Sequence, residues 1–237
     1  MLQQRAKDLQ TKVQSLRGLR VSADQADRLW TRAKSLQDKL SELNSLVGQV
    51  DILANNNVSV DLSALSPRCR DLRRCVEDLL PDFESDPSQI AAPNERLRFE
   101  FLDRLPELNR ELESVLLCSW QTYLDDKKPI IPPGLLESLA SVPDLQPLIT
   151  RVNAEISHLG RYRQQLPASA KAIQEACAIL QSLNQDWVSL NQSVPEEVRI
   201  FLKQANSEGV PLSGLTKPVM AWLQQHNLDV RLRVFIR

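Results

Sequence analysis

The segment LWTRAKSLQDKLSELNSLVGQV, residues 29–50, has the strongest periodic pattern in the chain. Its apolar residues alternate in steps of four and three, the spacing at which two helices pack side by side. This seam consists of Leu29, Ala33, Leu36, Leu40, Leu43, Val47 and Val50. We expect a helix from about Ala23 to Ala54, ended by the asparagines at 55–57, with a length of about 48 Å at 1.5 Å per residue. Such a helix needs a partner along most of its seam.

The same spacing is present at the amino terminus, so that segment should be helical from its first residues. Its apolar positions are Leu2, Ala6, Leu9, Val13 and Leu16. The register fails at residues 18–21, and the sequence Ser22-Ala-Asp-Gln25 has the form of a capping box that opens a new helix. A tight helical hairpin and a stutter within one helix both fit this pattern.

Prolines divide the middle of the chain. Ser66-Pro67 should open a helix that Pro81 stops, and residues 82–93 read as a surface loop. Helical periodicity then runs from Asn94 to Tyr123, with a break at Pro106. The proline-rich residues 127–134 form a connector, followed by a second helical bundle over 135–192.

The last segment, residues 193–237, differs in character. Ser193-Val-Pro-Glu196 should open one helix, and Thr216-Lys-Pro218 a second. Val230, Leu232, Val234 and Ile236 then alternate with other residues at the two-residue period of a strand. The predicted fold is therefore all-α: an elongated helical bundle with long antiparallel coiled-coil-like helices in 1–126, a connector in 127–134, a second bundle in 135–192 and a helix-helix-strand cap in 193–237.

Composition excludes several classes of function. The formal net charge is -1, with both signs interleaved, so no long-range field would recruit nucleic acid or an anionic membrane. No apolar run approaches the roughly 20 residues that cross a bilayer, and the amino terminus lacks the apolar core of a secretory signal. These features predict a soluble, cytoplasmic protein.

The sequence contains no recognisable metal-binding or catalytic motif. The four cysteines contain no CxxC pair, and the two histidines have no ligand-type neighbours, so we expect the cysteines to be small buried residues in a reducing compartment. Phosphate-binding glycine loops and the common hydrolase motifs are missing. The acidic pairs at 125–126 and 196–197 fit helix ends. We expect no enzyme activity and no cofactor.

Two surfaces are candidates for binding other protein subunits or a second copy of the chain. The first is the open part of the long seam, and the second is the carboxy-terminal module, whose strand either pairs internally or adds to a partner's sheet. The candidate residues are Leu36, Leu40, Leu43, Val47, Trp222, Val230, Leu232, Val234 and Ile236. The alternative is a nucleic-acid-binding accessory that uses a winged-helix-like carboxy-terminal module. DNA would then contact Lys217, Arg231, Arg233 and Arg237.

The sequence VPEEVRIFL at 194–202, with GVPLSGLT at 209–216 and Trp222-Leu223, resembles the carboxy-terminal tails of large coiled-coil or ATPase-type proteins of bacterial phage-defence systems. The resemblance covers residues 194–237. It implies a helical tail or a separate helical subunit that docks onto a defence or chromosome-associated complex. The nucleotide-binding motifs of those larger proteins are missing here, and the resemblance transfers no site residue.

Overall fold

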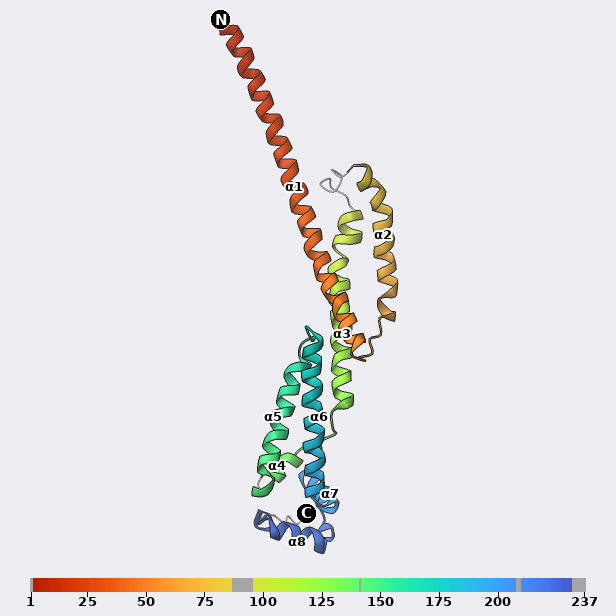
Figure 1. The fold of residues 1–237 in the computed structure, drawn as a ribbon, viewed down its shortest axis with the longest axis vertical. Coiled ribbons are helices and arrows are strands. Elements are labelled where there is room, and N and C mark those ends of the chain that lie inside the picture. Colours follow the sequence, from red (N-terminus) through yellow and green to blue (C-terminus); the bar gives the residue numbers. More distant parts are fainter. Residues whose placement is uncertain (1, 87–95, 141, 208–209, 232–237) are drawn as a thin grey trace. The chain divides into compact units, whose positions relative to one another are not determined.

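The computed structural model describes residues 2–86, 96–140, 142–207 and 210–231 (Figure 1). Within these ranges the protein is all-α, as predicted, and contains no strand. The α-helices are α1 (Leu2–Asn55), α2 (Ser66–Ser85), α3 (Leu105–Lys127), α4 (Leu135–Leu139), α5 (Gln146–Arg163), α6 (Ala170–Ser193), α7 (Glu196–Ser207) and α8 (Lys217–Gln225). The shorter elements are a π-helix, η3 (Arg96–Leu102), and the 3-10 turns η1 (Ser63–Leu65), η4 (Pro143–Leu145), η5 (Leu212–Gly214) and η6 (Asp229–Arg231).

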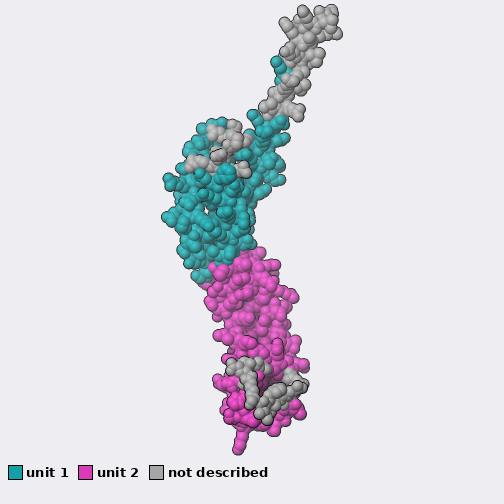
Figure 2. Space-filling model, turned by 180° about the vertical axis from the view of Figure 1, so that it is seen from behind, with its two compact units in different colours: residues 1–55, 59–116 teal, residues 56–58, 117–237 magenta. Residues whose placement is uncertain are grey.

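The chain forms two compact units, coloured separately in Figure 2. Unit 1 contains residues 1–55 and 59–116, and unit 2 contains residues 56–58 and 117–237. The boundary at 116–117 falls inside α3. The division into four segments drawn from composition stays a prediction.

Helix α1 is continuous over 54 residues, or about 81 Å. The first alternative for residues 18–25, a helical hairpin, is therefore wrong, because the helix continues through them. A single glycine at position 18 lowers helix propensity by only about 1 kcal/mol, which a long helix tolerates. The capping-box residues Ser22 and Gln25 are likewise compatible with a helix interior. The helix ends where the asparagines predict, and Asn57 adopts the left-handed conformation, with φ 60°.

Helix α2 also runs past its predicted stop. Pro81 lies inside the helix, which continues to Ser85, so the residues from Asp82 to Ser85 are not a loop. Pro81 lacks an amide hydrogen and leaves one carbonyl of the preceding turn without its helical partner. Because Pro81 is exposed, water can satisfy that carbonyl. The remainder of the predicted loop, 87–93, lies outside the described residues.

Unit 1 is built from α1, α2, η3 and the first part of α3. Helices α1 and α3 run in the same direction and α2 runs in the opposite direction (Figure 1). The break predicted at Pro106 is present, because η3 ends at Leu102 and α3 begins at Leu105. Lys39 of α1 donates a hydrogen bond from Nζ to the carbonyl oxygen of Leu102, at 2.7 Å. Over residues 23–45 no side chain of α1 is buried, and Leu46 is the first buried residue after this stretch.

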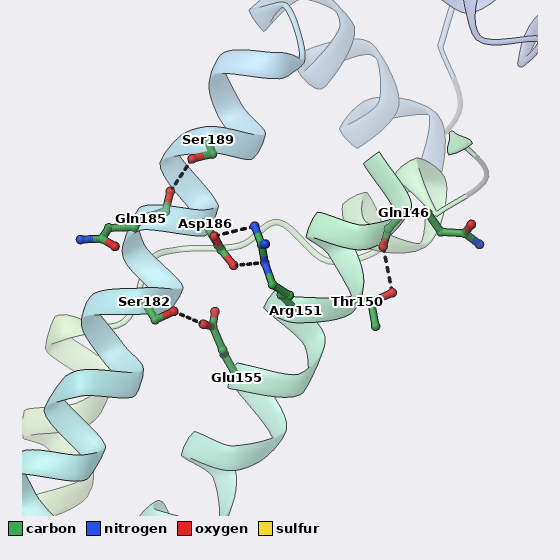
Figure 3. A network of polar contacts seen from close by, with 8 residues as sticks. All are labelled: Gln146, Thr150, Arg151, Glu155, Ser182, Gln185, Asp186 and Ser189. Carbon is green, nitrogen blue, oxygen red and sulfur yellow. Dashed lines mark hydrogen bonds and ion pairs between the residues drawn. The ribbon is translucent and has the colours of Figure 1, made fainter. Parts of the chain in front are cut away.

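In unit 2 the antiparallel helices α5 and α6 form the central pair. Ser169 caps α6 by accepting a hydrogen bond from the amide of Ala172, at 3.3 Å. The apolar positions that recur along α6 at helical spacing face inward; the buried residues are Ile173, Ala176, Leu180, Leu183 and Leu190. Polar contacts along the outside of the pair join Arg151 to Asp186 and Ser182 to Glu155 (Figure 3).

The last turns of α3 pack against the same two helices. Trp120 is fully buried and donates a hydrogen bond from Nε1 to the carbonyl oxygen of Tyr162, at 2.8 Å. Asn184 donates to the carbonyl oxygens of Lys127 and Leu180, at 3.1 and 2.9 Å. The carbonyls of Tyr162 and Lys127 lie at the ends of α5 and α3, where they have no acceptor role within their own helices.

A separate apolar core lies at the carboxy-terminal end of unit 2. Its buried residues come from α4, the ends of α5 and α6, α7, α8, η4 and the connecting turns: Leu135, Leu139, Val142, Leu145, Ile149, Leu190, Val194, Val198, Phe201, Leu202, Val219, Trp222, Leu223 and Leu228. The predicted strand does not begin at Val230, because that residue lies in the 3-10 turn η6. The amide of Leu228 donates to the carbonyl of Leu223 at 2.8 Å, which turns the chain after α8. The rest of the predicted strand, 232–237, lies outside the described residues.

Candidate protein-docking groove

An apolar groove of about 590 Å³ lies between the helices of unit 1, and we call it the unit 1 groove. Each helix of the unit contributes one face to it. Its lining residues are Leu40, Leu43, Val47, Val50, Leu62, Leu65, Ser66, Cys69, Leu72, Arg73, Val76, Phe101, Leu105, Leu108 and Leu112. Twelve of these fifteen side chains are aliphatic or aromatic, so the groove is built to contact apolar atoms.

Helical periodicity places these side chains on common faces. Leu40, Leu43, Val47 and Val50 recur at steps of three and four, so they form one stripe along α1. The same steps relate Cys69, Leu72 and Val76 on α2 and the three leucines at 105, 108 and 112 on α3. The second half of the seam of residues 29–50 therefore lines this groove.

The floor of the groove is buried and its edges are exposed. Leu65, Leu72 and Leu108 are among the buried residues of unit 1. At the edges, the exposed fractions are 40% for Leu40, 48% for Val47 and 41% for Val76. Large aliphatic side chains at such exposure along one groove leave apolar surface open to water, which soluble proteins usually cover.

The predicted protein-binding residues do not lie together in the structure. Leu40, Leu43 and Val47 line the groove together, and Leu36 lies half-buried one turn before them on α1. Trp222 is a core residue of unit 2, where its ring contacts that of His226 with centroids 4.4 Å apart. Val230 is exposed in η6. Leu232, Val234 and Ile236 lie outside the described residues.

The predicted nucleic-acid contacts are described only in part. Lys217 is exposed at the first position of α8. Arg231 ends η6, and its side chain is not described. Arg233 and Arg237 lie outside the described residues. The predicted basic surface is therefore represented by Lys217 alone in the part of the chain where side chains are placed.

The sequence pattern identified only the α1 wall of the groove and missed the walls formed by α2 and by η3 with α3. The α2 wall contains Cys69, which is exposed, whereas all four cysteines were expected to be buried. That expectation is wrong for Cys118 as well, which is also exposed, and holds for Cys75. The seven-residue spacing of Cys69 and Val76 is a heptad repeat and is the signal that could have placed both on one face.

The ionisable groups of the described residues do not converge on the groove. No group of three or more histidine, cysteine or carboxylate side chains is placed to hold a metal ion in the described ranges. The pKa of Asp61 lies below its usual value because the carboxylate accepts a hydrogen bond from the amide of Ser63, at 2.9 Å. The pKa of Lys127 is raised by its hydrogen bond to the hydroxyl of Tyr123, at 3.0 Å. Each of these shifts comes from a local surface contact.

A second hollow of about 600 Å³ lies in unit 2 along the proline-rich connector. Its lining mixes polar and apolar side chains, among them Asp125, Lys128 and Asn153. Ile130 stands out from this connector and is almost fully exposed. The hollow lacks the continuous apolar wall of the unit 1 groove, which therefore is the stronger candidate for a docking site.

No protein-family model, curated protein or solved structure matches this chain. None of the helices described here combines the length and the apolar character needed to cross a membrane.

Proposed function

We propose that this protein is a non-catalytic helical scaffold that binds other protein subunits through the unit 1 groove. The observation that carries the proposal is the exposed apolar edge formed by Leu40, Val47 and Val76 on two neighbouring helices. Covering such a surface contributes about 25 cal/mol per Å² of apolar area removed from water. The groove offers few polar groups and no charged cluster among its described lining residues, so burial of apolar side chains is the chemistry it supports best.

The fitting occupant is an amphipathic helix. Grooves between helices bind partner helices that present apolar residues at positions i, i+3 or i+4, and i+7. Three helices that leave one apolar side open correspond to a four-helix bundle with one member missing. The resemblance of the carboxy-terminal tail makes a cytoplasmic bacterial phage-defence complex the first setting in which to seek the partner.

A photo-cross-linking amino acid placed at Val47 tests this proposal. The matched control carries the same amino acid at Ser41, which is exposed and lies about 160° around α1 from Leu43 at 100° per residue. After irradiation in cells, products specific to position 47 are identified by mass spectrometry, and the partner is purified for a binding measurement. We expect a product at position 47 that position 41 does not give.

Binding must then depend on the groove. Leu40→Glu with Val47→Glu places two charges on exposed groove edges, which should leave the helix intact and weaken partner binding by at least about tenfold. Equal binding by this variant and the unchanged chain would contradict the proposal, as would identical cross-linking from positions 41 and 47.

A further inference from the structure

The face of α2 that borders the unit 1 groove is apolar and exposed at its centre. Cys69, Val76 and Leu80 lie within about 40° of one another around the helix axis, at 100° per residue. All three are exposed, Leu80 with an exposed fraction of 50%. A second helix laid along this face would cover apolar surface that unit 1 leaves open.

The charged residues of α2 are sorted along the helix. All four of its arginines lie in the first ten residues, 66–75, and four of its five carboxylates lie in the last ten, 76–85. The helix dipole favours the opposite order, with acidic residues near the amino end and basic residues near the carboxy end. The charge order therefore does not serve the stability of α2 itself.

Four of these charges lie at the edge of the exposed apolar face. Arg70, Arg73, Glu77 and Glu84 are between about 60° and 120° around the axis from Val76, on the side of Leu80. Arg73 and Glu77 now pair with each other, with Nε and Oε1 2.8 Å apart, and both side chains are largely exposed. An exposed pair of this kind adds little stability, so both groups can exchange partners at small cost.

We infer that a second copy of this chain occupies the groove, with the two α2 helices antiparallel about a two-fold axis near Val76. Arg70 then faces Glu84 of the second copy, and Arg73 faces its Glu77. Each pair is displaced from direct opposition by two residues, or about 3 Å, which long side chains can span. The two-fold axis repeats both pairs, so basic half meets acidic half on both sides of Val76.

A parallel arrangement would set the basic half of one α2 beside the basic half of the other, and the acidic halves likewise, and is disfavoured by repulsion. In the antiparallel arrangement, the exposed apolar residues of each α2 enter the groove of the other copy. The inference thus rests on the proposed use of the groove as a protein-docking surface and names its occupant.

Charge reversal tests the pairing. We expect sedimentation velocity on the full chain to give a species of twice 26.9 kDa. Arg70→Glu with Arg73→Glu, or Glu77→Arg with Glu84→Arg, should weaken dimerisation by about tenfold or more, because like charges then meet at every pair. All four changes in one chain restore the opposite signs and should restore dimerisation to within about threefold of the unchanged protein.

A control on the same helix uses charge reversals away from the exposed apolar face. Arg74→Glu with Asp82→Arg alters two exposed residues that lie at least about 120° around the axis from both Val76 and Leu80. This variant should dimerise like the unchanged chain. Equal weakening by the control, or failure of the fourfold change to restore dimerisation, would overturn the pairing.

Disulfide formation distinguishes the antiparallel from the parallel arrangement of the two α2 helices. The exposed Cys118 is first replaced by serine to remove a competing thiol. Two Cys69 residues in the antiparallel dimer are 14 residues apart along the axis, or about 21 Å, beyond the roughly 7 Å limit between the Cα atoms of a disulfide. Val76→Cys at the two-fold axis should cross-link, in a chain with Cys69→Ser. Cross-linking through Cys69 and not through position 76 would overturn the antiparallel arrangement.

The two proposals can fail separately. A chain that stays monomeric at all concentrations, while position 47 cross-links to a different protein, overturns the dimer and leaves the docking function standing. A monomer without any product specific to position 47 overturns both.

Discussion

Arg151 of α5 and Asp186 of α6 form a two-point ion pair, with Nε to Oδ2 at 2.9 Å and Nη2 to Oδ1 at 3.1 Å (Figure 3). The side chain of Asp186 is 16% exposed, which limits solvent screening on that partner. Arg151→Ala and Asp186→Ala should therefore each lower the free energy of unfolding, and a double-mutant cycle should give a coupling energy of about 0.5–1 kcal/mol. Urea unfolding followed by circular dichroism measures all four chains.

Arg151→Lys provides the matched control, because an ammonium group keeps the charge and cannot make the two-point contact. Its stability should lie between those of the unchanged chain and the alanine variant. A coupling energy indistinguishable from zero would mean that the two helices are held by their apolar contacts alone.

Trp120 has both a packing role and a hydrogen-bonding role. Trp120→Ala should cost about 3–5 kcal/mol, because it empties a fully buried site. Trp120→Phe fills most of that site but leaves the carbonyl of Tyr162 without its donor, and should cost about 1–3 kcal/mol. Denaturant midpoints of the three chains give the comparison, and equal losses for both variants would contradict a separate contribution from packing.

Asn109 of α3 is 1% exposed, and neither its Oδ1 nor its Nδ2 has a hydrogen-bond partner among the described residues. An unsatisfied buried amide is costly, so Asn109→Leu should raise the free energy of unfolding by about 1–3 kcal/mol. Asn184 is the control, since its amide donates two hydrogen bonds. Asn184→Leu should lower stability, and a loss of stability in Asn109→Leu would show that the amide has a partner in solution.

Tyr162 donates a hydrogen bond from its hydroxyl to Oε2 of Glu175, at 3.0 Å, and this contact raises the pKa of the tyrosine. The folded chain therefore holds this proton more tightly than the unfolded chain. The resulting stabilisation is complete below the unfolded pKa of about 10 and is lost as the pH rises through the higher folded pKa. Titration of tyrosinate absorbance in a Tyr123→Phe chain isolates Tyr162.

Glu175→Gln should return the pKa of Tyr162 toward about 10, because the negative acceptor is removed. Lys171→Gln is the control for general changes of charge nearby, since Lys171 contacts Glu175 more weakly, at 3.8 Å. If both variants shift the titration equally, the hydrogen bond to Glu175 is not the cause.

Local patterns predicted the all-α class and the ends of many helices, because capping residues and apolar spacing act over a few neighbours. Asn57 illustrates this, since it follows the predicted end of α1 and adopts the left-handed conformation. The continuity of α1 through Gly18 and of α2 through Pro81 was not predicted. In both cases the helix-forming residues on either side outweigh one unfavourable residue.

The candidate site was predicted on one wall only. Leu40, Leu43 and Val47 were recognisable because they share a helix and a repeat. Their place beside Val76 and Phe101 depends on how α2 and η3 return along α1, and no local pattern specifies that return. Partial exposure of the groove edge is also a tertiary property, which apolar spacing alone does not reveal.

The sorted charges of α2 make ionic strength act in two opposing directions. Screening by added electrolyte weakens the unfavourable interaction between the four arginines and the positive end of the helix dipole, which stabilises the helix. The same screening weakens attraction between oppositely charged halves of neighbouring copies. Raised salt should thus increase the helicity of a peptide spanning 66–85 while it dissociates the assembled chain.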